Sequence, residues 1–315
     1  MGTDWDAIVV GGGAAGLAAA LMLGRSRRRI LVLDAGEPRN RFAAHMQAVL
    51  GHDGVPPEQL LARGREEVRR YGVQVEEAVV HGVAEDATGL AVETDGAALR
   101  TRALVVATGV RDTLPPVPGL AEHWGRSVLH CPYCHGWEVR DRDLGVLVQS
   151  PMGAHQAQLV RQLSDSVTVF TGVAGTPADV LGPAAERLRS RGVRIVPEPV
   201  LDVVGSDSAL QAVRTADGTE HPVQALFVAA ALQPLDGFLS GLDLARADTP
   251  VGRFLAVDPM QRTSSPRIWA AGNVAAPMAN VPLATAAGTM AGAAVNAALT
   301  EEDFDRAAWA AGTPS

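Results

Sequence analysis

The chain has 315 residues, of which 47% are hydrophobic and 20% charged, and its formal net charge is -8. This length and apolar content suit two domains of ordinary size, each with its own core. All 27 basic residues are arginine, which excludes lysine-based chemistry. No long basic run occurs, so nucleic acid is not an expected partner.

No segment predicts export or membrane insertion. The apolar run Ala7–Val10 follows the acidic residues Asp4 and Asp6 and ends at three glycines, unlike a signal peptide. The alanine-rich stretch Ala284–Leu299 is too short and too interrupted for a membrane span and predicts a buried helix. We therefore expect a protein of the reducing cytoplasm, with no membrane partner.

The first residues carry a dinucleotide-binding pattern of strand, glycine turn, helix and strand. The two strands are predicted over 6–10 and 30–33, and the helix over 17–23. In the turn between them, Gly11 permits the tight bend and Gly13 lets the backbone approach a pyrophosphate. Gly16 lets the helix press on the sheet.

Two further features make this pattern more specific than an isolated glycine turn. The amides at the helix N-terminus, where Ala14 and Ala15 lie, would hold phosphate groups. Asp34 ends the second strand, where a carboxylate accepts hydrogen bonds from ribose hydroxyls. We expect a bound dinucleotide, and a purely structural glycine turn is the alternative.

The remaining elements alternate between strands and helices. Helices are expected over 57–71, 154–163 and 284–299. Strands are expected over 73–80, 90–94, 104–107, 144–148, 167–170, 226–232 and 267–274. The small-residue turn Ala107-Thr108-Gly109 ends one strand, and a proline-rich linker over 114–119 follows it.

This order predicts an α/β fold of two three-layer, Rossmann-like nucleotide-binding domains, the second inserted into the first. The first domain is expected to comprise residues 1–114 and 247–315. The inserted domain is expected to comprise residues 118–243 and to contain both cysteines.

The two cysteines, Cys131 and Cys134, are the only ones in the chain and form a Cys-x-x-Cys motif. Two thiols at this spacing can close a small disulfide and open it again. The motif therefore predicts dithiol–disulfide chemistry. A zinc site that adds the neighbouring His130 and His135 is disfavoured, because immediate neighbours rarely converge on one metal.

These motifs resemble, in the same order, those of the low-molecular-weight thioredoxin-reductase-like flavoproteins. The shared segments are Gly11–Gly16, Asp34, Ala107-Thr108-Gly109, the cysteine pair and 270–274. The resemblance implies FAD in the first domain, bound in part by Gly272 and Asn273, and a homodimer. The family usually has Asp where Asn273 stands, bonded to a ribitol hydroxyl, and an amide can make the same bond. The family's Arg-Gln that follows is replaced by residues 280–283.

A second departure from the family concerns the inserted domain. The reductases of the family carry a G-x-G-x-x-A loop for NADPH, followed by arginines that hold its 2′-phosphate. Here Gln149 and Pro151 occupy the two glycine positions, and their side chains would obstruct a pyrophosphate. The segment 168–174 contains no arginine. We expect that NADPH is no longer used, and weak residual binding is the alternative.

The cysteine motif also resembles that of the dithiol oxidases of holomycin, gliotoxin and related natural products. That resemblance implies oxidation of a small-molecule dithiol to an intramolecular disulfide, with O2 as the final acceptor and H2O2 as product. Cys134 is expected to face the flavin and Cys131 the substrate. His135 is the expected proton acceptor and His130 the alternative. Tyr133 and Trp137 are candidate substrate walls.

Two other functions remain open at this point. One is a thioredoxin-reductase-like disulfide reductase that takes electrons from NADPH or ferredoxin. The other is a non-catalytic FAD-binding redox sensor that uses its cysteine pair as a switch. His45, His52 and Arg111 are further candidates near the flavin or substrate, and surface positions are the alternative for each.

Overall fold

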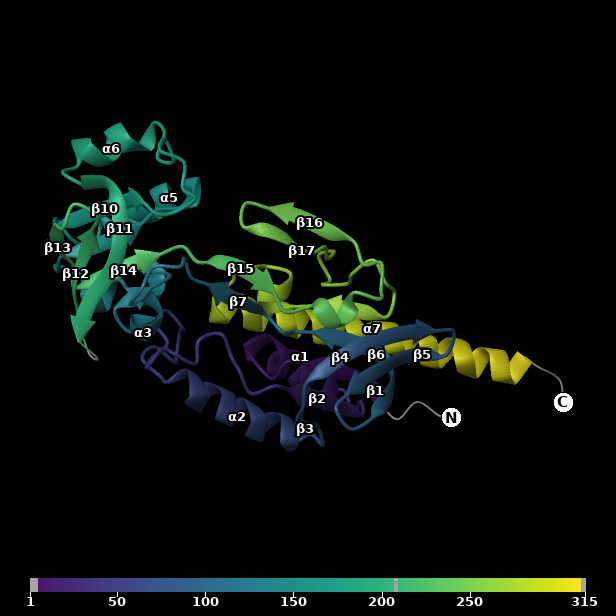
Figure 1. Ribbon diagram of the computed structural model, residues 1–315. Coiled ribbons are helices and arrows are strands. Elements are labelled where there is room, and N and C mark those ends of the chain that lie inside the picture. The colour runs from purple at the N-terminus through teal and green to yellow at the C-terminus, as the bar shows by residue number, and fades with distance from the viewer. Residues whose placement is uncertain (1–4, 207–208, 313–315) are drawn as a thin grey trace. The chain divides into compact units, whose positions relative to one another are not determined.

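The computed structural model describes residues 5–206 and 209–312 (Figure 1). The chain forms two compact units. The first comprises Met1–Arg39, Glu58–Arg111 and Leu232–Ser315, and the second comprises Asn40–Pro57 and Asp112–Ala231. Residues 40–57 and 112–114 thus belong to the second unit and residues 232–243 to the first, which differs from the predicted boundaries.

The first unit is built on a seven-stranded sheet. Its strands are β1 (Trp5–Val10), β2 (Ile30–Asp34), β3 (Gln74–Glu77), β4 (Val80–Asp86), β5 (Gly89–Thr94), β6 (Ala98–Val106) and β18 (Ile268–Ala270). The order is β3-β2-β1-β6-β5-β4, and β18 also pairs with β6. The pairs among β3, β2, β1, β6 and β18 are parallel, and those among β4, β5 and β6 are antiparallel.

Alternation along the central strands creates two cores, one on each face of this sheet. Ala7 and Val9 of β1 belong to one buried cluster, and Ile8 and Val10 belong to the other. Because residues 7–10 of the strand are buried on both faces, this stretch is apolar throughout. The unit also contains α1 (Ala14–Arg25), most of α2 (Pro57–Arg69), α7 (Val281–Gly312), the hairpin β16 (Arg246–Thr249) and β17 (Gly252–Leu255), and the 3-10 turns η2 (Gly237–Leu239) and η3 (Gly272–Val274).

Helix α7 lies beside α1 in the first unit (Figure 1). A Cβ on Gly288 would lie 2.0 Å from the Ala15 carbonyl oxygen, and one on Gly292 would lie 2.6 Å from the Ala19 carbonyl oxygen. Small residues therefore allow the two helices to approach closely. By length and composition alone, residues 281–311 could cross a membrane, and 33% of the most apolar window is buried within the structure. Because α7 spans Val281–Gly312, the predicted helix over 284–299 was too short.

The second unit contains another seven-stranded sheet, in the order β13-β12-β11-β10-β9-β14-β8. Its strands are β8 (Val128–Leu129), β9 (Leu144–Leu147), β10 (Val167–Gly172), β11 (Arg194–Ser206), β12 (Ala209–Thr215), β13 (Glu220–Pro222) and β14 (Ala225–Val228). The neighbouring strands β8, β14, β9, β10 and β11 are parallel. Strands β12 and β13 extend the sheet in antiparallel pairs. The helices are α3 (Leu120–His123), α4 (Pro132–His135), α5 (Pro151–Val160), α6 (Ala184–Ser190) and the 3-10 turn η1 (Trp137–Val139).

Two of the passages of the chain between the units lie in short strands that pair with each other, β7 (Val110–Thr113) and β15 (Ala231–Pro234). The predicted strand over 226–232 is therefore two strands, β14 and β15. The predicted strand over 73–80 is likewise divided into β3 and β4. Helix α5 begins at Pro151, three residues before its predicted start, because proline has the φ of a first helical residue and needs no amide there.

A buried arginine ties the C-terminal half of α7 to the sheet. The Arg102 side chain is only 7% exposed, and it bonds Asp6 of β1 at 3.0 Å and Asp303 of α7 at 2.6 Å. It also bonds Glu302 of α7 at 3.0 Å. A buried cation with three carboxylate partners is costly to remove, because the carboxylates then repel one another.

We predict that Arg102→Met lowers the free energy of unfolding by about 2 kcal/mol, because its partners are partly exposed and recover some hydration. Denaturant unfolding followed by circular dichroism measures the change. Arg253→Met is the control, since Arg253 bonds Asp248 in an exposed pair at 3.3 Å and its loss should cost less than about 0.5 kcal/mol. Equal losses in both variants would contradict this account.

Candidate functional site

The glycine turn after β1 lies against the turn that ends β6. Gly11 has a φ of 105°, and a Cβ there would lie 2.5 Å from the Ala107 carbonyl oxygen. A Cβ on Gly16 would lie 1.8 Å from the Gly11 carbonyl oxygen. Gly13 differs, because nothing lies within 4 Å of the position its Cβ would take. Two glycines thus permit close packing, and Gly13 leaves an open backbone face at the start of α1.

The turn after β18 joins the same cluster. Gly272 has a φ of 77°, and a Cβ there would lie 3.0 Å from the Ala15 side chain. Thr108 lies in the turn after β6, and its buried Oγ1 has no hydrogen-bond partner among the described residues. Three separate segments therefore meet at one end of the parallel strands, where nucleotides bind in this type of sheet. An open glycine face and an unpartnered buried hydroxyl fit the pyrophosphate-containing cofactor FAD.

The Asp34 carboxylate is held in place by a residue that the sequence did not indicate. Asp34 Oδ2 accepts a hydrogen bond from Arg65 of α2 at 2.8 Å, and the Asp34 side chain is 15% exposed. A Cβ on Gly12 would lie 2.4 Å from the same oxygen. Gly12 and Arg65 therefore both determine where the carboxylate lies. Arg65 is 31 residues away in the chain, so no local pattern could reveal it.

Asn273 organises the loop that follows β18. The two protons of its Nδ2 are shared among the carbonyl oxygens of Ala276, Pro277 and Ala279, at 3.1, 3.0 and 2.8 Å. A carboxylate at this position would place an oxygen against those three oxygens. The amide therefore suits this loop better than the aspartate that is usual in the family, and Asn273 Oδ1 is the atom available to accept a hydrogen bond from a ligand.

The cysteine pair lies in the second unit, where β8 leads into the short helix α4. Cys131 immediately precedes α4 and Cys134 lies within it, and both are partly buried. The amides of Cys134 and His135 donate to the Cys131 carbonyl at 3.1 and 3.2 Å. One helical turn therefore holds the two cysteines at adjacent levels.

The two histidines beside the cysteines have different environments. Burial lowers the pKa of His135 below its ordinary value, and the nearby Glu138 partly opposes that effect. His135 is therefore neutral near pH 7. His130 Nδ1 donates to the carbonyl of Val228 at 3.3 Å, which leaves Nε2 as its acceptor. No described group of three or more His, Cys, Asp or Glu residues could hold a metal ion.

Two exposed aromatic side chains lie close to the cysteines in sequence, Tyr133 between them and Trp137 after them. Tyr133 is 75% exposed and Trp137 is 69% exposed. The Arg140 guanidinium stacks 3.9 Å from the centre of the Trp137 ring and also donates to the Trp137 carbonyl at 2.6 Å. The indole is thus held in one orientation while its surface remains open to a ligand.

The other predicted candidates are two histidines of the segment 40–57 and an arginine of β7. His45 is exposed and bonds the Gly54 carbonyl at 3.1 Å. His52 is half-buried in the same segment, which belongs to the second unit. Arg111 is exposed on β7. A role of these three residues near the flavin or substrate therefore stays a prediction.

The turn between β9 and α5 differs from the glycine turn of the first unit. Ser150 precedes the helix, and Pro151 is its first residue. Across the fully described stretch 149–151, no residue has a positive φ, whereas Gly11 does. Because Pro151 has no amide proton and Gln149 carries a side chain, the turn cannot offer an open row of backbone donors.

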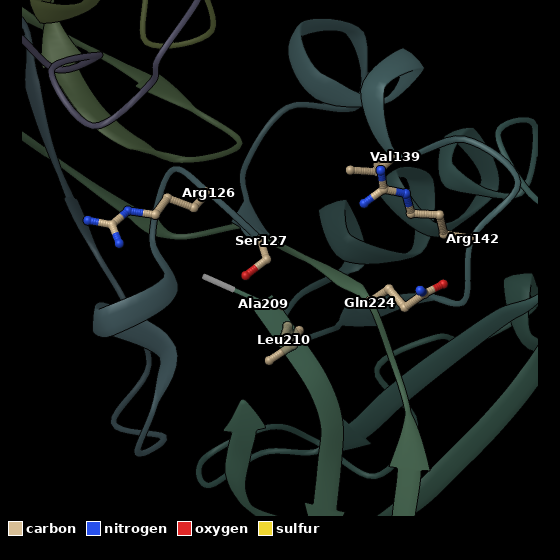
Figure 2. A pocket seen from close by; sticks show the side chains of 7 residues that line it. All are labelled: Arg126, Ser127, Val139, Arg142, Ala209, Leu210 and Gln224. Atoms are coloured by element: carbon tan, nitrogen blue, oxygen red, sulfur yellow. The ribbon is translucent and has the colours of Figure 1, made fainter. Parts of the chain in front are cut away.

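A polar cavity in the second unit lies apart from the cysteines (Figure 2). Its volume is about 180 Å³, and it is lined by Arg126, Ser127, Val139, Arg142, Ala209, Leu210 and Gln224. Several of these residues precede the amino ends of β8, β9 and β14, whereas the cysteines follow the carboxyl end of β8. Figure 2 shows the Arg126 guanidinium extending away from Ser127. None of the predicted site residues lines this cavity.

Most of this chain matches known proteins in sequence. A family model described as pyridine nucleotide-disulphide oxidoreductase matches residues 5–291. The thioredoxin reductase tcpT of Claviceps purpurea is 33% identical over 91% of this chain and 92% of its own length. The thioredoxin reductase sirT of Leptosphaeria maculans is 31% identical over 93% of each chain.

A solved structure supports the same relationship. The crystal structure of HlmI is 40% identical, with a TM-score of 0.91 over 98% of this chain and 96% of the other. These matches confirm the predicted fold class and the resemblance to thioredoxin-reductase-like proteins.

We predict that Asn273→Asp destabilises the loop after β18, because a carboxylate loses the amide hydrogen bonds and repels the carbonyl oxygens. The expected loss of unfolding free energy is about 1–3 kcal/mol, measured by denaturant unfolding without added FAD. Asn296→Asp is the matched control, since Asn296 Oδ1 accepts from Arg28 Nε at 2.9 Å and a carboxylate retains that bond. Equal stability of the two variants would show that the Asn273 contacts are unimportant.

Proposed function

Because this chain belongs to the pyridine nucleotide-disulphide oxidoreductase family, whose members are flavoproteins, we propose that it is an FAD-dependent oxidase of small-molecule dithiols. The observation that carries the proposal is the turn between β9 and α5. A redox-competent cysteine pair lies in the same unit as this turn, which lacks the glycines and phosphate donors that a pyridine nucleotide requires. Electrons must therefore enter from another donor, and the simplest donor for a disulfide is a dithiol.

The proposed exchange begins with the Cys131–Cys134 disulfide. One substrate thiolate attacks Cys131, forms a mixed disulfide and releases Cys134 as a thiolate. The second substrate thiol attacks the substrate sulfur bonded to Cys131, so the substrate leaves as an intramolecular disulfide and both cysteines are reduced. FAD, when bound, supplies the acceptor for this electron pair and its transfer to O2, so that one dithiol and one O2 give one disulfide and one H2O2.

His135 is the residue we assign to proton removal from the substrate thiol. A free thiol has a pKa of about 8.5, so only a few per cent is ionised near neutral pH. The lowered pKa of His135 keeps its imidazole neutral at that pH and able to accept the proton. His130 is the alternative, because the Val228 carbonyl orients its ring through Nδ1 and Nε2 can still accept a proton.

The substrate class follows from the surroundings of the cysteines. The rings of Tyr133 and Trp137, close in sequence to the cysteines, are exposed and offer flat apolar surfaces. These surfaces suit a compact, partly unsaturated dithiol better than an extended protein loop. Together with the resemblance of the cysteine motif, they support the reduced form of a holomycin-type natural product as the substrate.

We predict that a reduced holomycin-type dithiol drives O2 consumption by the FAD-loaded protein without any pyridine nucleotide. Cys134→Ser should lower the rate at least about 100-fold, because Cys131 then has no disulfide partner and the substrate thiolate has no disulfide bond to attack. An oxygen electrode with a peroxide assay measures both, and free FAD with the same dithiol is the background control.

Two other outcomes would overturn this proposal. Undiminished O2 consumption in the Cys134→Ser variant would exclude the cysteine route. Reduction of the flavin by NADPH, with no response to the dithiol, would instead identify a disulfide reductase.

We predict that kcat/KM for the dithiol falls on acidification with an inflection below 6.5, the ordinary histidine pKa. The sign follows because neutral imidazole is the active form, and a lowered pKa keeps it neutral to lower pH. His135→Gln should remove this inflection and reduce kcat/KM at pH 7 by about 100-fold. His155→Gln, at an exposed position on α5, is the control. An unchanged pH profile in His135→Gln would assign the proton transfer elsewhere.

A further inference from the structure

A buried glutamine of α5 holds the peptide that precedes the first cysteine. Gln156 is 7% exposed. Its Nε2 donates to the His130 carbonyl at 2.6 Å, across 26 residues of sequence. Its Oε1 is buried and has no hydrogen-bond partner among the described residues.

This contact acts on the backbone of the cysteine motif. The His130 carbonyl and the Cys131 amide belong to one planar peptide group, so fixing the carbonyl direction also fixes the amide. The next carbonyl, that of Cys131, accepts from the amides of Cys134 and His135 at 3.1 and 3.2 Å. Gln156 therefore fixes the peptide immediately before the turn that holds both cysteines.

Burying the side-chain amide of Gln156 costs free energy that packing alone would not require. An apolar side chain of the same length could fill the space without burying an amide, whereas Gln156 leaves one buried acceptor unsatisfied. A carboxylate would be worse, because its oxygen would face the oxygen of His130. The position thus requires a donor, and a neutral one in these surroundings.

We propose that Gln156 is a positioning residue that sets the reactivity of the Cys131–Cys134 pair through its hydrogen bond to the His130 carbonyl. The inference deepens the proposed function. It rests on that function only in that the reactivity of the disulfide then matters for catalysis. It adds a role for α5 that does not depend on a nucleotide at the turn before this helix.

Gln156→Glu tests this role because its donor capacity depends on pH. A protonated glutamic acid can donate to the His130 carbonyl, and an ionised one cannot. Burial favours the protonated form, and ionisation at higher pH places a negative charge against the carbonyl oxygen. A merely structural role would change thermal unfolding but would not make the reactivity of the disulfide depend on pH in this way.

The measurement is the rate at which a water-soluble phosphine reduces the Cys131–Cys134 disulfide in the FAD-loaded protein, followed by alkylation and mass counting of the thiols. We expect Gln156→Glu to differ from the wild type by about tenfold at pH 8.5 and by less than about twofold at pH 5.5, the effect of one lost hydrogen bond to a positioned group. Gln158→Glu is the matched control, on the same helix at a half-buried position. Its ratio to the wild type should stay constant with pH.

Two results would overturn the inference: a constant ratio for Gln156→Glu, or the same pH dependence in Gln158→Glu. If Gln156→Glu does not fold, Gln156→Met carries the test. Its reduction rate should then differ from the wild type by about tenfold at every pH, and a wild-type rate would refute the proposal. Since a phosphine is neither a dithiol nor dependent on flavin turnover, failure of the proposed oxidase activity would leave this result readable.

Discussion

Access to backbone amides at two strand-to-helix turns determines what each unit of this protein can hold. In the first unit, Gly11 has a φ of 105° and Gly13 leaves space where a side chain would stand. In the second, the same place in the fold carries Gln149, Ser150 and Pro151. A diphosphate needs close approach to free amides, so only the first turn suits a dinucleotide. The assignment of a single cofactor, FAD, depends on this difference.

The difference between the two turns bears on the direction in which the cysteine pair carries electrons. A disulfide with a flavin partner can carry electrons in either direction, and the available donor determines which. In the proposed function, the groups around the cysteines serve a dithiol donor: a neutral imidazole at His135, a fixed indole surface at Trp137 and a rigid backbone before Cys131. The second unit keeps its nucleotide-binding topology, and α5 contributes a hydrogen bond to the cysteine motif.

The sequence was most informative where a function depends on residues that are close together in the chain. The glycine turn, Asp34 and the cysteine motif each form a local pattern, and the structure brings Gly11 against Ala107 and Gly272 against Ala15. Contacts across long stretches could not be predicted: Arg65 reaches Asp34, and Gln156 reaches His130. The breaks at 78–79 and 229–230 were missed because the apolar sequence continues through them without glycine or proline. The full length of α7 was missed because its polar end is held by distant partners such as Arg102.

The most direct test of the central claim is isothermal titration of the FAD-loaded protein with NADPH, in the absence of any thiol. The account predicts no saturable heat at concentrations below about 1 mM, because the turn after β9 offers no diphosphate site. Saturable binding with a micromolar dissociation constant that is lost on mutation of Gln149 or Ser150 would contradict it.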